Sequence, residues 1–176
     1  MSEPVTDRQR IDDLRSILKL NGNERVFLRI GRFHKHYEKT IYQSVNLVKE
    51  LNKNNFPCIL ILLGSIQDTD LVKKLEDTPD PNVRIVTDGK FTANSSELID
   101  IAEFIIGTGR SLMEASSKGK VLLTSNSNGY YPILVDKVNF KILSNTNFSP
   151  RNLASGEKDG NFNSILEFLQ NGSELD

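Results

Sequence analysis

The stretch FIIGTGRSLMEASSKGK, residues 104–120, contains the change from strand to helix on which the fold of this chain depends. The apolar run at its start has the composition of a buried strand, and residues 107–110, Gly-Thr-Gly-Arg, follow directly. Residues 111–118 then have the spacing of a helix that contains a single acid, Glu114. A glycine-rich turn between a strand and a helix favours phosphate binding, because the first helical N–H groups lack partners and the helix dipole attracts an anion.

The rest of the sequence repeats this alternation of strand and helix. Because the strand-like runs are short and apolar and are separated by helices, they predict a parallel sheet that helices cover on both faces. Right-handed crossovers then make the chain a single Rossmann-like α/β domain with a sheet of about six strands. The strand-like runs are 25–30, 58–63, 83–86, 104–106 and 121–124, and the helical patterns are 40–54, 71–77, 95–102 and 111–118, with serines expected to cap the helix at 95–102.

Length, charge and hydropathy exclude several classes of protein. The chain has 176 residues, a length for which one domain is the expectation. Its formal net charge is -1, whereas a general nucleic-acid binder should be more cationic. No apolar run reaches the length of about 18 residues that a membrane span needs, and no apolar segment follows Met1, so we expect a cytoplasmic chain. The single cysteine, Cys58, heads an apolar run and is predicted to be a buried, inert thiol.

Glycines stand at the predicted carboxyl ends of several strands, where parallel α/β sheets bind ligands. Each glycine, taken alone, has the simpler interpretation of a residue that permits a tight turn. Two of them are followed directly by arginine, at Gly31-Arg32 and Gly109-Arg110, and this pairing favours an anionic ligand. The full set at the strand ends is Gly31-Arg32, Gly64-Ser65, Asp88-Gly89 and Gly107-Thr108-Gly109-Arg110.

Motifs for dinucleotides, metals and nucleophiles find little support in the sequence. The dinucleotide pattern G-x-G-x-x-G is met at Gly107 and Gly109 but fails at Leu112, and no acid follows about 20 residues on. The P-loop pattern is absent, which excludes a Walker-type NTPase. His34 and His36 form an H-x-H pair that could hold zinc, but the sequence shows no third ligand, and no nucleophile–histidine grouping indicates a hydrolase.

Two stretches of the chain resemble the C-terminal, nucleotide-sugar-binding half of GT-B fold glycosyltransferases, especially the retaining enzymes of glycosyltransferase family 4. The first, DDLRSILKLNGNERVFLRIGRF (12–33), is similar to the family's short helix, loop and strand ending in Gly-Arg. The second, GTGRSLMEASSKGKVLLTSNSNGYY (107–131), is similar to its glycine-rich turn, Glu-containing helix and apolar strand. The resemblance extends over roughly residues 12–150, and it implies a linker or N-terminal extension at 1–11 and a donor-binding domain at 12–176.

The resemblance implies a role for each residue at the matching positions. Arg32 would contact the diphosphate of the sugar donor with help from Lys39, although Lys35 competes for that second role. Glu114 would accept hydrogen bonds from the ribose hydroxyls, and the alternative is a solvent-exposed acid on the helix surface. The donor-binding set implied in this way is Gly31, Arg32, Lys39, Gly64, Gly107, Thr108, Gly109, Arg110, Ser111, Leu112 and Glu114, with Gly109, Arg110 and Ser111 offering main-chain N–H groups to the phosphates.

One position departs from the family pattern. Many members carry a second Glu eight residues before the ribose acid, and here that position is Ile106. The catalytic residues and the contacts of the transferred sugar are therefore left unassigned. The resemblance implies neither a metal nor a cofactor, because the donor substrate is itself a nucleoside-diphosphate sugar.

The resemblance also implies a partner domain. A GT-B enzyme has two Rossmann-like domains, and the resemblance implies that the N-terminal one, which mainly holds the acceptor, would be a separate partner of this sequence. We therefore expect this chain alone to be inactive and the two-domain enzyme to transfer a sugar to a saccharide or lipid-linked acceptor, with the inner face of the membrane as one location for it. The alternatives are a stand-alone nucleotide-binding or interaction module, and a part of a nucleotide-sugar epimerase.

Overall fold

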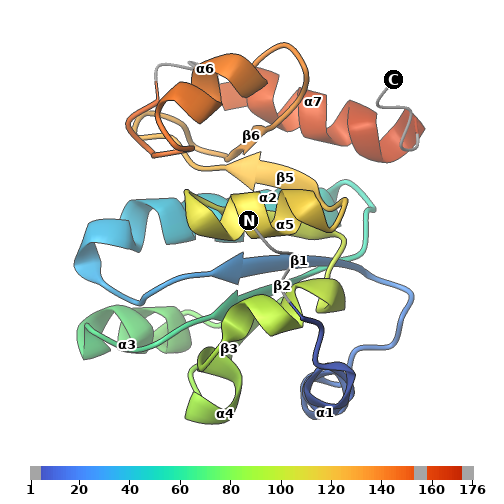
Figure 1. The fold of residues 1–176 in the computed structure, drawn as a ribbon, viewed down its shortest axis with the longest axis vertical. Helices are drawn as coiled ribbons and strands as arrows, with labels where there is room; N and C mark the ends of the chain where they lie inside the picture. The colour runs from blue at the N-terminus through green and yellow to red at the C-terminus, as the bar shows by residue number, and fades with distance from the viewer. Residues whose placement is uncertain (1–4, 153–157, 172–176) are drawn as a thin grey trace.

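A six-stranded sheet forms the centre of the computed structural model, which describes residues 5–152 and 158–171 (Figure 1). The strand order is β3-β2-β1-β4-β5-β6, so the first strand of the chain lies inside the sheet. The neighbouring pairs from β3 to β5 are all parallel. The strands are β1 (Arg25–Ile30), β2 (Cys58–Leu63), β3 (Val83–Val86), β4 (Phe104–Gly107), β5 (Val121–Thr124) and β6 (Ile133–Leu134).

The order of the strands determines where a ligand can bind. The chain builds outward from β1 to β3 and then returns to the other side of β1 with β4. The helices that follow β1 and β4 therefore lie on opposite faces, and the carboxyl ends of these two strands border the topological switch point of the sheet. The predicted single Rossmann-like α/β domain is confirmed.

The sixth strand differs from the predicted parallel arrangement. β6 pairs with β5 in the antiparallel direction, through Leu123↔Leu134 and Thr124↔Ile133. A parallel neighbour needs a crossover connection, usually a helix, whereas a turn-containing segment, 125–132, joins these two strands. A short reversed strand therefore closes this edge of the sheet.

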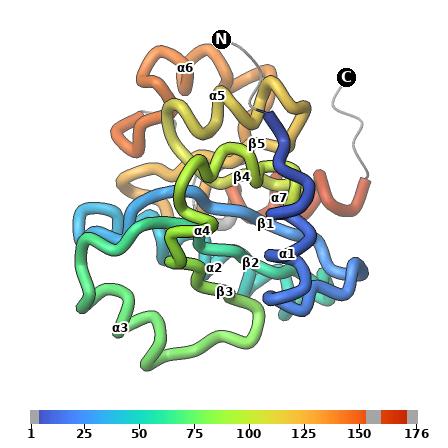
Figure 2. The backbone as a smooth tube through the Cα atoms, turned by 60° about the horizontal axis from the view of Figure 1, so that its bottom comes forward, coloured from blue at the N-terminus to red at the C-terminus, as the bar shows by residue number. Residues whose placement is uncertain are grey.

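Helices cover both faces of the sheet, as the alternation of elements predicts (Figures 1 and 2). Within the described residues, no helix is both long enough and apolar enough to cross a lipid bilayer. One face carries α1 (Arg8–Leu18), α4 (Gly89–Thr92), the 3-10 helix η2 (Ser95–Ile101), α5 (Arg110–Ser117) and α6 (Phe140–Asn145). The other face carries α2 (Glu38–Lys53), α3 (Thr69–Asp77) and α7 (Lys158–Asn171). The 3-10 helix η1 (Lys35–Tyr37) directly precedes α2.

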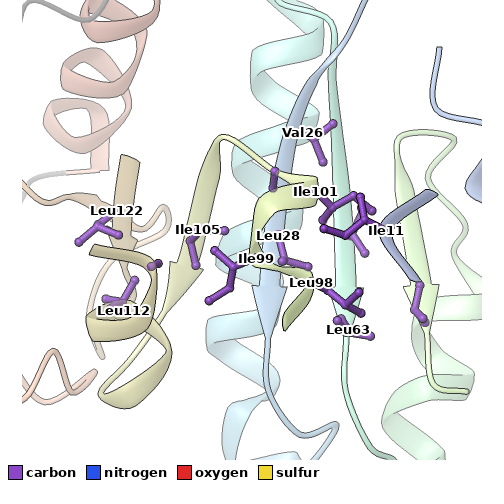
Figure 3. Close-up of a cluster of buried hydrophobic side chains, with 14 of the residues drawn as sticks. Ile11, Val26, Leu28, Leu63, Leu98, Ile99, Ile101, Ile105, Leu112 and Leu122 are labelled. Carbon is purple, nitrogen blue, oxygen red and sulfur yellow. The ribbon is translucent and has the colours of Figure 1, made fainter. Parts of the chain in front are cut away.

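The two faces of the sheet hold separate apolar clusters, because successive side chains of a strand point to opposite sides. In β1, Val26 and Leu28 belong to the cluster that α1 and α5 cover, and Phe27 belongs to the cluster beneath α2. Figure 3 shows the first cluster, in which Ile11 of α1 and Leu112 of α5 lie on the same side of the strands. Burial on both faces explains why the strands read as continuous apolar runs.

The segment 95–102 differs from the predicted serine-capped helix. It forms a 3-10 helix, and the residue at its N-cap is Asn94, which has a φ of 49° and makes no side-chain capping hydrogen bond. Leu98 and Ile99 are fully buried in the cluster of Figure 3. Packing against the sheet therefore sets the conformation of this segment, and the serine-cap prediction was wrong.

Cys58 is buried at the start of β2, as predicted. Burial raises the pKa of its thiol to about 12. The thiolate, which is the nucleophilic form, is therefore scarce at neutral pH, and the structure supports the interpretation of an inert thiol.

Asp100 ties the N-terminal segment to the end of α5. Its carboxylate accepts hydrogen bonds from Lys118 Nζ at 2.8 Å and from the hydroxyl of Thr6, and Lys120 Nζ lies 3.1 Å away. Partial burial acts to raise the pKa of Asp100, but the hydrogen bonds from Lys118, Thr6 and Lys120 outweigh it and hold the pKa well below its usual range. Because the folded pKa is lowered, this contribution to stability is present above about pH 4 and is lost as the pH falls through the folded value.

Replacing Asp100 by asparagine is expected to lower the free energy of unfolding by about 2 kcal/mol at pH 7, because Lys118, with a side chain only 4% exposed, loses its charged partner. The difference from the unsubstituted chain should shrink as the pH falls from about 4 toward 2. Urea unfolding across this pH range measures it. The control is Glu103→Gln, whose ion pair with Arg25 is more than half exposed and should matter little. A difference that stays constant with pH would contradict this role of Asp100.

Candidate functional site

A cleft of about 630 Å³ lies at the switch point of the sheet, beyond the carboxyl ends of β1 and β4. Its walls come from η1 and the start of α2, from the turn before α5, from the loop after β5, and from the segment that follows α6. This is the place where parallel α/β sheets bind ligands. The lining residues are His36, Tyr37, Lys39, Thr40, Thr108, Gly109, Ser127, Thr146, Asn147, Ser149, Pro150 and Arg151.

Hydrogen bonds hold the walls of the cleft together. Lys39 Nζ donates to the carbonyl oxygen of Ser127, which ties α2 to the loop after β5. Gln43 Nε2 donates to the carbonyl of Gly129 at 2.6 Å and so anchors the same loop from a buried position. Thr124 Oγ1 donates to the carbonyl of Phe148 at 2.9 Å and attaches the segment after α6. The cleft is therefore preformed by contacts within the chain.

The charge of the cleft favours an anionic ligand. Lys39 and Arg151 contribute cations to the lining, and the described lining residues include no carboxylate. Lys39 Nζ bonds a neutral carbonyl group, so its charge is not neutralised there. The acid beside it in the sequence, Glu38, is engaged by Lys74 Nζ at 3.0 Å. A concave surface with this excess of positive charge attracts anions.

The turn before α5 lies at the cleft, as the sequence predicts, but its N–H groups are only partly available. Gly109 has φ 54° and ψ -126°, a conformation that favours glycine, and its N–H donates to the carbonyl of Asn147 at 3.0 Å. The prediction that Gly109 offers its N–H group to a phosphate therefore does not hold in this structure. The main-chain N–H groups of Arg110, Ser111 and Leu112 have no partner among the described residues.

Glu114 is buried, with 9% of its surface exposed. Its Oε1 accepts a hydrogen bond from Arg110 Nε at 2.7 Å, and the Arg110 side chain is 84% exposed. The alternative of a solvent-exposed acid on the helix surface was wrong, because the apolar face of α5 draws this residue inward. Glu114 is not among the residues that line the cleft, whereas Thr108 and Gly109 are.

The Gly31-Arg32 turn is held rigidly at the end of β1. The N–H of Gly31 donates to the carbonyl of Leu63 at 3.0 Å, and the N–H of Phe33 donates to the carbonyl of Ser65 at 2.9 Å. Phe33 is 3% exposed and anchors the turn in the core. Arg32 between them is exposed and has no ion pair among the described residues. It lines a cavity of about 10 Å³ beside the end of β1 and does not line the cleft itself.

The structure separates the two lysines that compete for the same predicted role. Lys39 lines the cleft, whereas Lys35 does not and instead lines a neighbouring pocket that Lys39 also borders. Position therefore favours Lys39. His34 and His36, which flank Lys35, are joined by a hydrogen bond from the main-chain N–H of His36 to the side-chain Nδ1 of His34 at 3.1 Å.

Close packing explains why residue 64 is a glycine, which the sequence alone does not show. It is buried at the end of β2, and a Cβ atom there would lie 1.5 Å from the carbonyl oxygen of Gly31. Only glycine lets the ends of β1 and β2 approach this closely. Gly64 thus lets the main chain of the Gly31-Arg32 turn pack directly against the end of β2, and this role does not depend on any ligand.

Several residues of the site are not among the predicted set. Asn147, Ser149 and Arg151 come from a segment without a strand or helix pattern that would mark it as a wall of the cleft. Arg29 lies inside β1 and donates from Nη2 to Thr40 Oγ1 at 2.8 Å. A signal for Arg29 was present in the sequence, because a charge within a strand buried on both faces is unusual.

Another cavity, of about 400 Å³, lies at the other end of the strands, away from the cleft. Its charged lining residues are largely paired with one another: Arg25 with Glu103, and Lys120 with Asp100. It also lies at the amino ends of the strands, where α/β sheets seldom bind ligands. The cleft at the carboxyl ends is therefore the better candidate.

Comparison with known proteins bears on the fold. No protein-family model matches the sequence, and no curated protein is detectably similar to it. The catalytic domain of starch synthase IV from Arabidopsis thaliana, bound to ADP and acarbose, is 16% identical and has a TM-score of 0.52, and the match covers 96% of this chain and 36% of that one. UDP-GlcNAc 2-epimerase from Neisseria meningitidis, bound to UDP-GlcNAc, is 13% identical with a TM-score of 0.52, and the match covers 93% of this chain and 43% of that one.

At these identities the likeness concerns the fold. The chain has a Rossmann-like α/β fold that matches one half of a GT-B fold. It spans less than half the length of either solved structure.

Proposed function

We propose that this chain is the nucleotide-sugar-binding half of a retaining GT-B glycosyltransferase similar to those of family 4. The observation that carries the proposal is the cationic cleft of about 630 Å³ at the switch point, bordered by the start of α5. The starch synthase of similar fold is bound to ADP, and the epimerase of similar fold to UDP-GlcNAc, so both contain a nucleoside diphosphate group. An acceptor would be held by a partner domain across the cleft.

The chemistry follows from the charge on the leaving group. When a sugar leaves a nucleoside diphosphate, negative charge develops on the diphosphate, and preorganised cations and N–H groups stabilise that charge. In this chain, Arg32 and Lys39 would supply the cations, and the N–H groups at 110–112, for which the described residues provide no acceptor, would supply the dipoles of the helix start. The nucleotide would then extend from the cleft along α5.

The ribose would lie at Glu114, and this placement has a structural requirement. Because Arg110 bonds the Glu114 carboxylate, a ribose must displace the Arg110 side chain to reach it. The Arg110 side chain is 84% exposed and can turn into solvent, whereas the buried Glu114 carboxylate would then need the ribose hydroxyls as its new hydrogen-bond donors. The released guanidinium would remain beside the phosphates.

Calorimetric titration of the chain with UDP, GDP and ADP, and with their nucleosides, tests the proposal. We expect weak binding of at least one nucleoside diphosphate and much weaker binding of the nucleosides, because the cationic cleft recognises phosphate. We also expect no transfer of sugar to a saccharide or lipid acceptor by this chain alone. Absence of binding to every diphosphate in the series would contradict the proposal.

A nucleotide-sugar epimerase is the second candidate, and the likeness to UDP-GlcNAc 2-epimerase over 93% of this chain favours it. The two functions leave different products when the chain is joined to its N-terminal partner domain. Epimerisation yields a nucleotide sugar with a changed configuration at one carbon, whereas transfer yields a free nucleoside diphosphate and a glycosylated acceptor. Product analysis by mass spectrometry and NMR distinguishes them.

Replacing Glu114 by glutamine tests the ribose assignment. The substitution keeps the shape of the side chain and removes its charge, so we expect ribonucleotide affinity to fall about 10-fold and the affinity for 2′-deoxy analogues to change less. Titration with both nucleotide series measures this.

Arg110→Ala is the matched control for Glu114→Gln, because it removes the same ion pair but keeps the carboxylate. This variant should retain the preference for ribose over deoxyribose. If Glu114→Gln leaves that preference intact while the fold is unchanged, Glu114 serves only as the partner of Arg110.

A further inference from the structure

Arg29 is a buried charge within the central part of the sheet. It lies in β1, between β2 and β4, where its neighbours in register are Leu62 and Ile106. Both neighbours are apolar and almost completely buried, and Arg29 itself is 7% exposed. A guanidinium group in such a place has lost most of its hydration, which is unfavourable unless another group compensates.

The contacts that Arg29 makes with the described part of the chain leave its charge without a counter-ion. Its hydrogen bond to Thr40 Oγ1, at 2.8 Å, goes to a neutral hydroxyl, which in turn donates to the carbonyl of Tyr37 at 2.9 Å. Among the described residues, no carboxylate lies within ion-pair distance of Arg29. Burial lowers the pKa of Arg29 to about 10, and the nearby Tyr37 opposes that shift. The group stays charged at neutral pH.

A structural role for Arg29 does not need this charge. Holding Thr40 in place requires one donor, which a neutral amide could provide without the desolvation of a cation. The guanidinium has several further N–H groups, and none of them has a protein partner among the described residues. The charge itself therefore calls for an explanation outside the chain.

Arg29 and Arg32 share a small cavity at the end of β1. Both line the space of about 10 Å³ beside Phe33 and Ile41, which holds roughly one oxygen-sized atom. Arg29 also bonds Thr40, a residue of the cleft wall, and so connects the lining of this cavity to that of the cleft. The rest of its lining is Gly31 and apolar side chains, so the two guanidinium groups are the side-chain hydrogen-bond donors of this space, and they favour an oxyanion.

We infer that Arg29 and Arg32 together form an anion site that takes an oxygen of the distal phosphate, Arg29 from within the strand and Arg32 from the turn. The inference rests on the proposed function, and it identifies Arg29 as the residue that determines the preference for nucleoside diphosphates over monophosphates. Binding of the phosphate supplies a counter-charge that Arg29 does not find among the described residues. Arg29 is thus a binding residue outside the set that the glycine-rich turns indicate.

The test compares Arg29→Met, which keeps the apolar stem and removes the charge, with the unsubstituted chain. Calorimetry measures affinity for a nucleoside diphosphate, the matching monophosphate and inorganic pyrophosphate at several NaCl concentrations. We expect Arg29→Met to lose about 10- to 100-fold in affinity for the diphosphate and for pyrophosphate, and less than about threefold for the monophosphate. The salt dependence of diphosphate binding should also decrease.

Arg25→Met is the matched control, because Arg25 lies in the same strand at its exposed amino end. It should leave all three affinities unchanged. Arg29→Lys keeps a charge but cannot form a bidentate contact, so it should lose about 10-fold for the diphosphate, and it provides the test if Arg29→Met does not fold. Equal losses for monophosphate and diphosphate, or no loss in either variant, would overturn the inference.

The same titrations separate this inference from the proposed function. If the chain binds a nucleoside diphosphate and Arg29→Met binds it equally well, the function stands and the anion site is wrong. If the chain binds no nucleotide but binds pyrophosphate through Arg29, the anion site stands and the nucleotide-sugar function is wrong. If the chain binds neither nucleotides nor pyrophosphate, both are wrong.

Discussion

Replacing Gly64 by alanine is expected to lower the free energy of unfolding by about 3 kcal/mol or more. The added Cβ would lie 1.5 Å from the carbonyl oxygen and 2.7 Å from the carbonyl carbon of Gly31, and both are main-chain atoms that cannot rotate away. The ends of β1 and β2 would have to separate, which strains the hydrogen bond from the N–H of Gly31 to Leu63. Urea unfolding followed by circular dichroism measures the loss.

Gly31→Ala is the matched control for Gly64→Ala. Gly31 lies directly opposite, but a Cβ there meets no atom within 4 Å and its φ is not positive. This variant should change stability by no more than about 0.5 kcal/mol. Similar losses in both variants would mean that Gly64 is required for its flexibility and not for close packing.

Replacing Arg32 by alanine is expected to weaken the binding of UDP or GDP by about 10- to 100-fold, because a charged hydrogen bond contributes about 1.5–3 kcal/mol. Binding of the bare nucleoside should change much less. The Arg32 side chain is exposed, and hydrogen bonds hold the main chain on both sides of it. We therefore expect the variant to fold, so that weaker binding reports the loss of the charge. Calorimetry with the diphosphate and its nucleoside measures the effect.

Lys35→Ala is the control for Arg32→Ala. Lys35 is an exposed cation of the same segment that lines neither the cleft nor the small cavity. Its removal should change diphosphate affinity by less than about threefold, since an exposed charge outside the lining of the site is screened by salt. If Arg32→Ala weakens nucleoside and nucleotide binding equally, Arg32 maintains the conformation of the turn and does not bind the diphosphate.

The strands were predictable from the sequence because burial on both faces makes each of them a continuous apolar run. Four of them, at 25–30, 58–63, 83–86 and 121–124, have the predicted bounds. The switch point and the glycine-rich turn before α5 follow from the same alternation, since right-handed crossovers leave few ways to arrange the sheet. The place of the cleft was therefore predictable, although its walls were not.

The features that sequence reasoning missed depend on contacts between distant residues. Whether Glu114 is exposed depends on how α5 packs on the sheet, and its helical spacing alone suits either outcome. The availability of the Gly109 N–H group depends on Asn147, which comes from a segment far along the chain. The antiparallel β6 is only two residues long, too short to produce a periodic pattern.

Local pattern thus specified the strands of the sheet, the parallel direction of most of them and the end of the strands at which a ligand would bind. Apolar periodicity and glycine positions carry this information because they are properties of short segments. The charge of the site arose differently. Arg29 becomes an unpaired buried cation only because β2 and β4 flank it and α2 covers it, with Thr40 as its one partner among the described residues. Burial and the presence of a counter-ion belong to the folded surroundings of a residue, and no segment of sequence contains them.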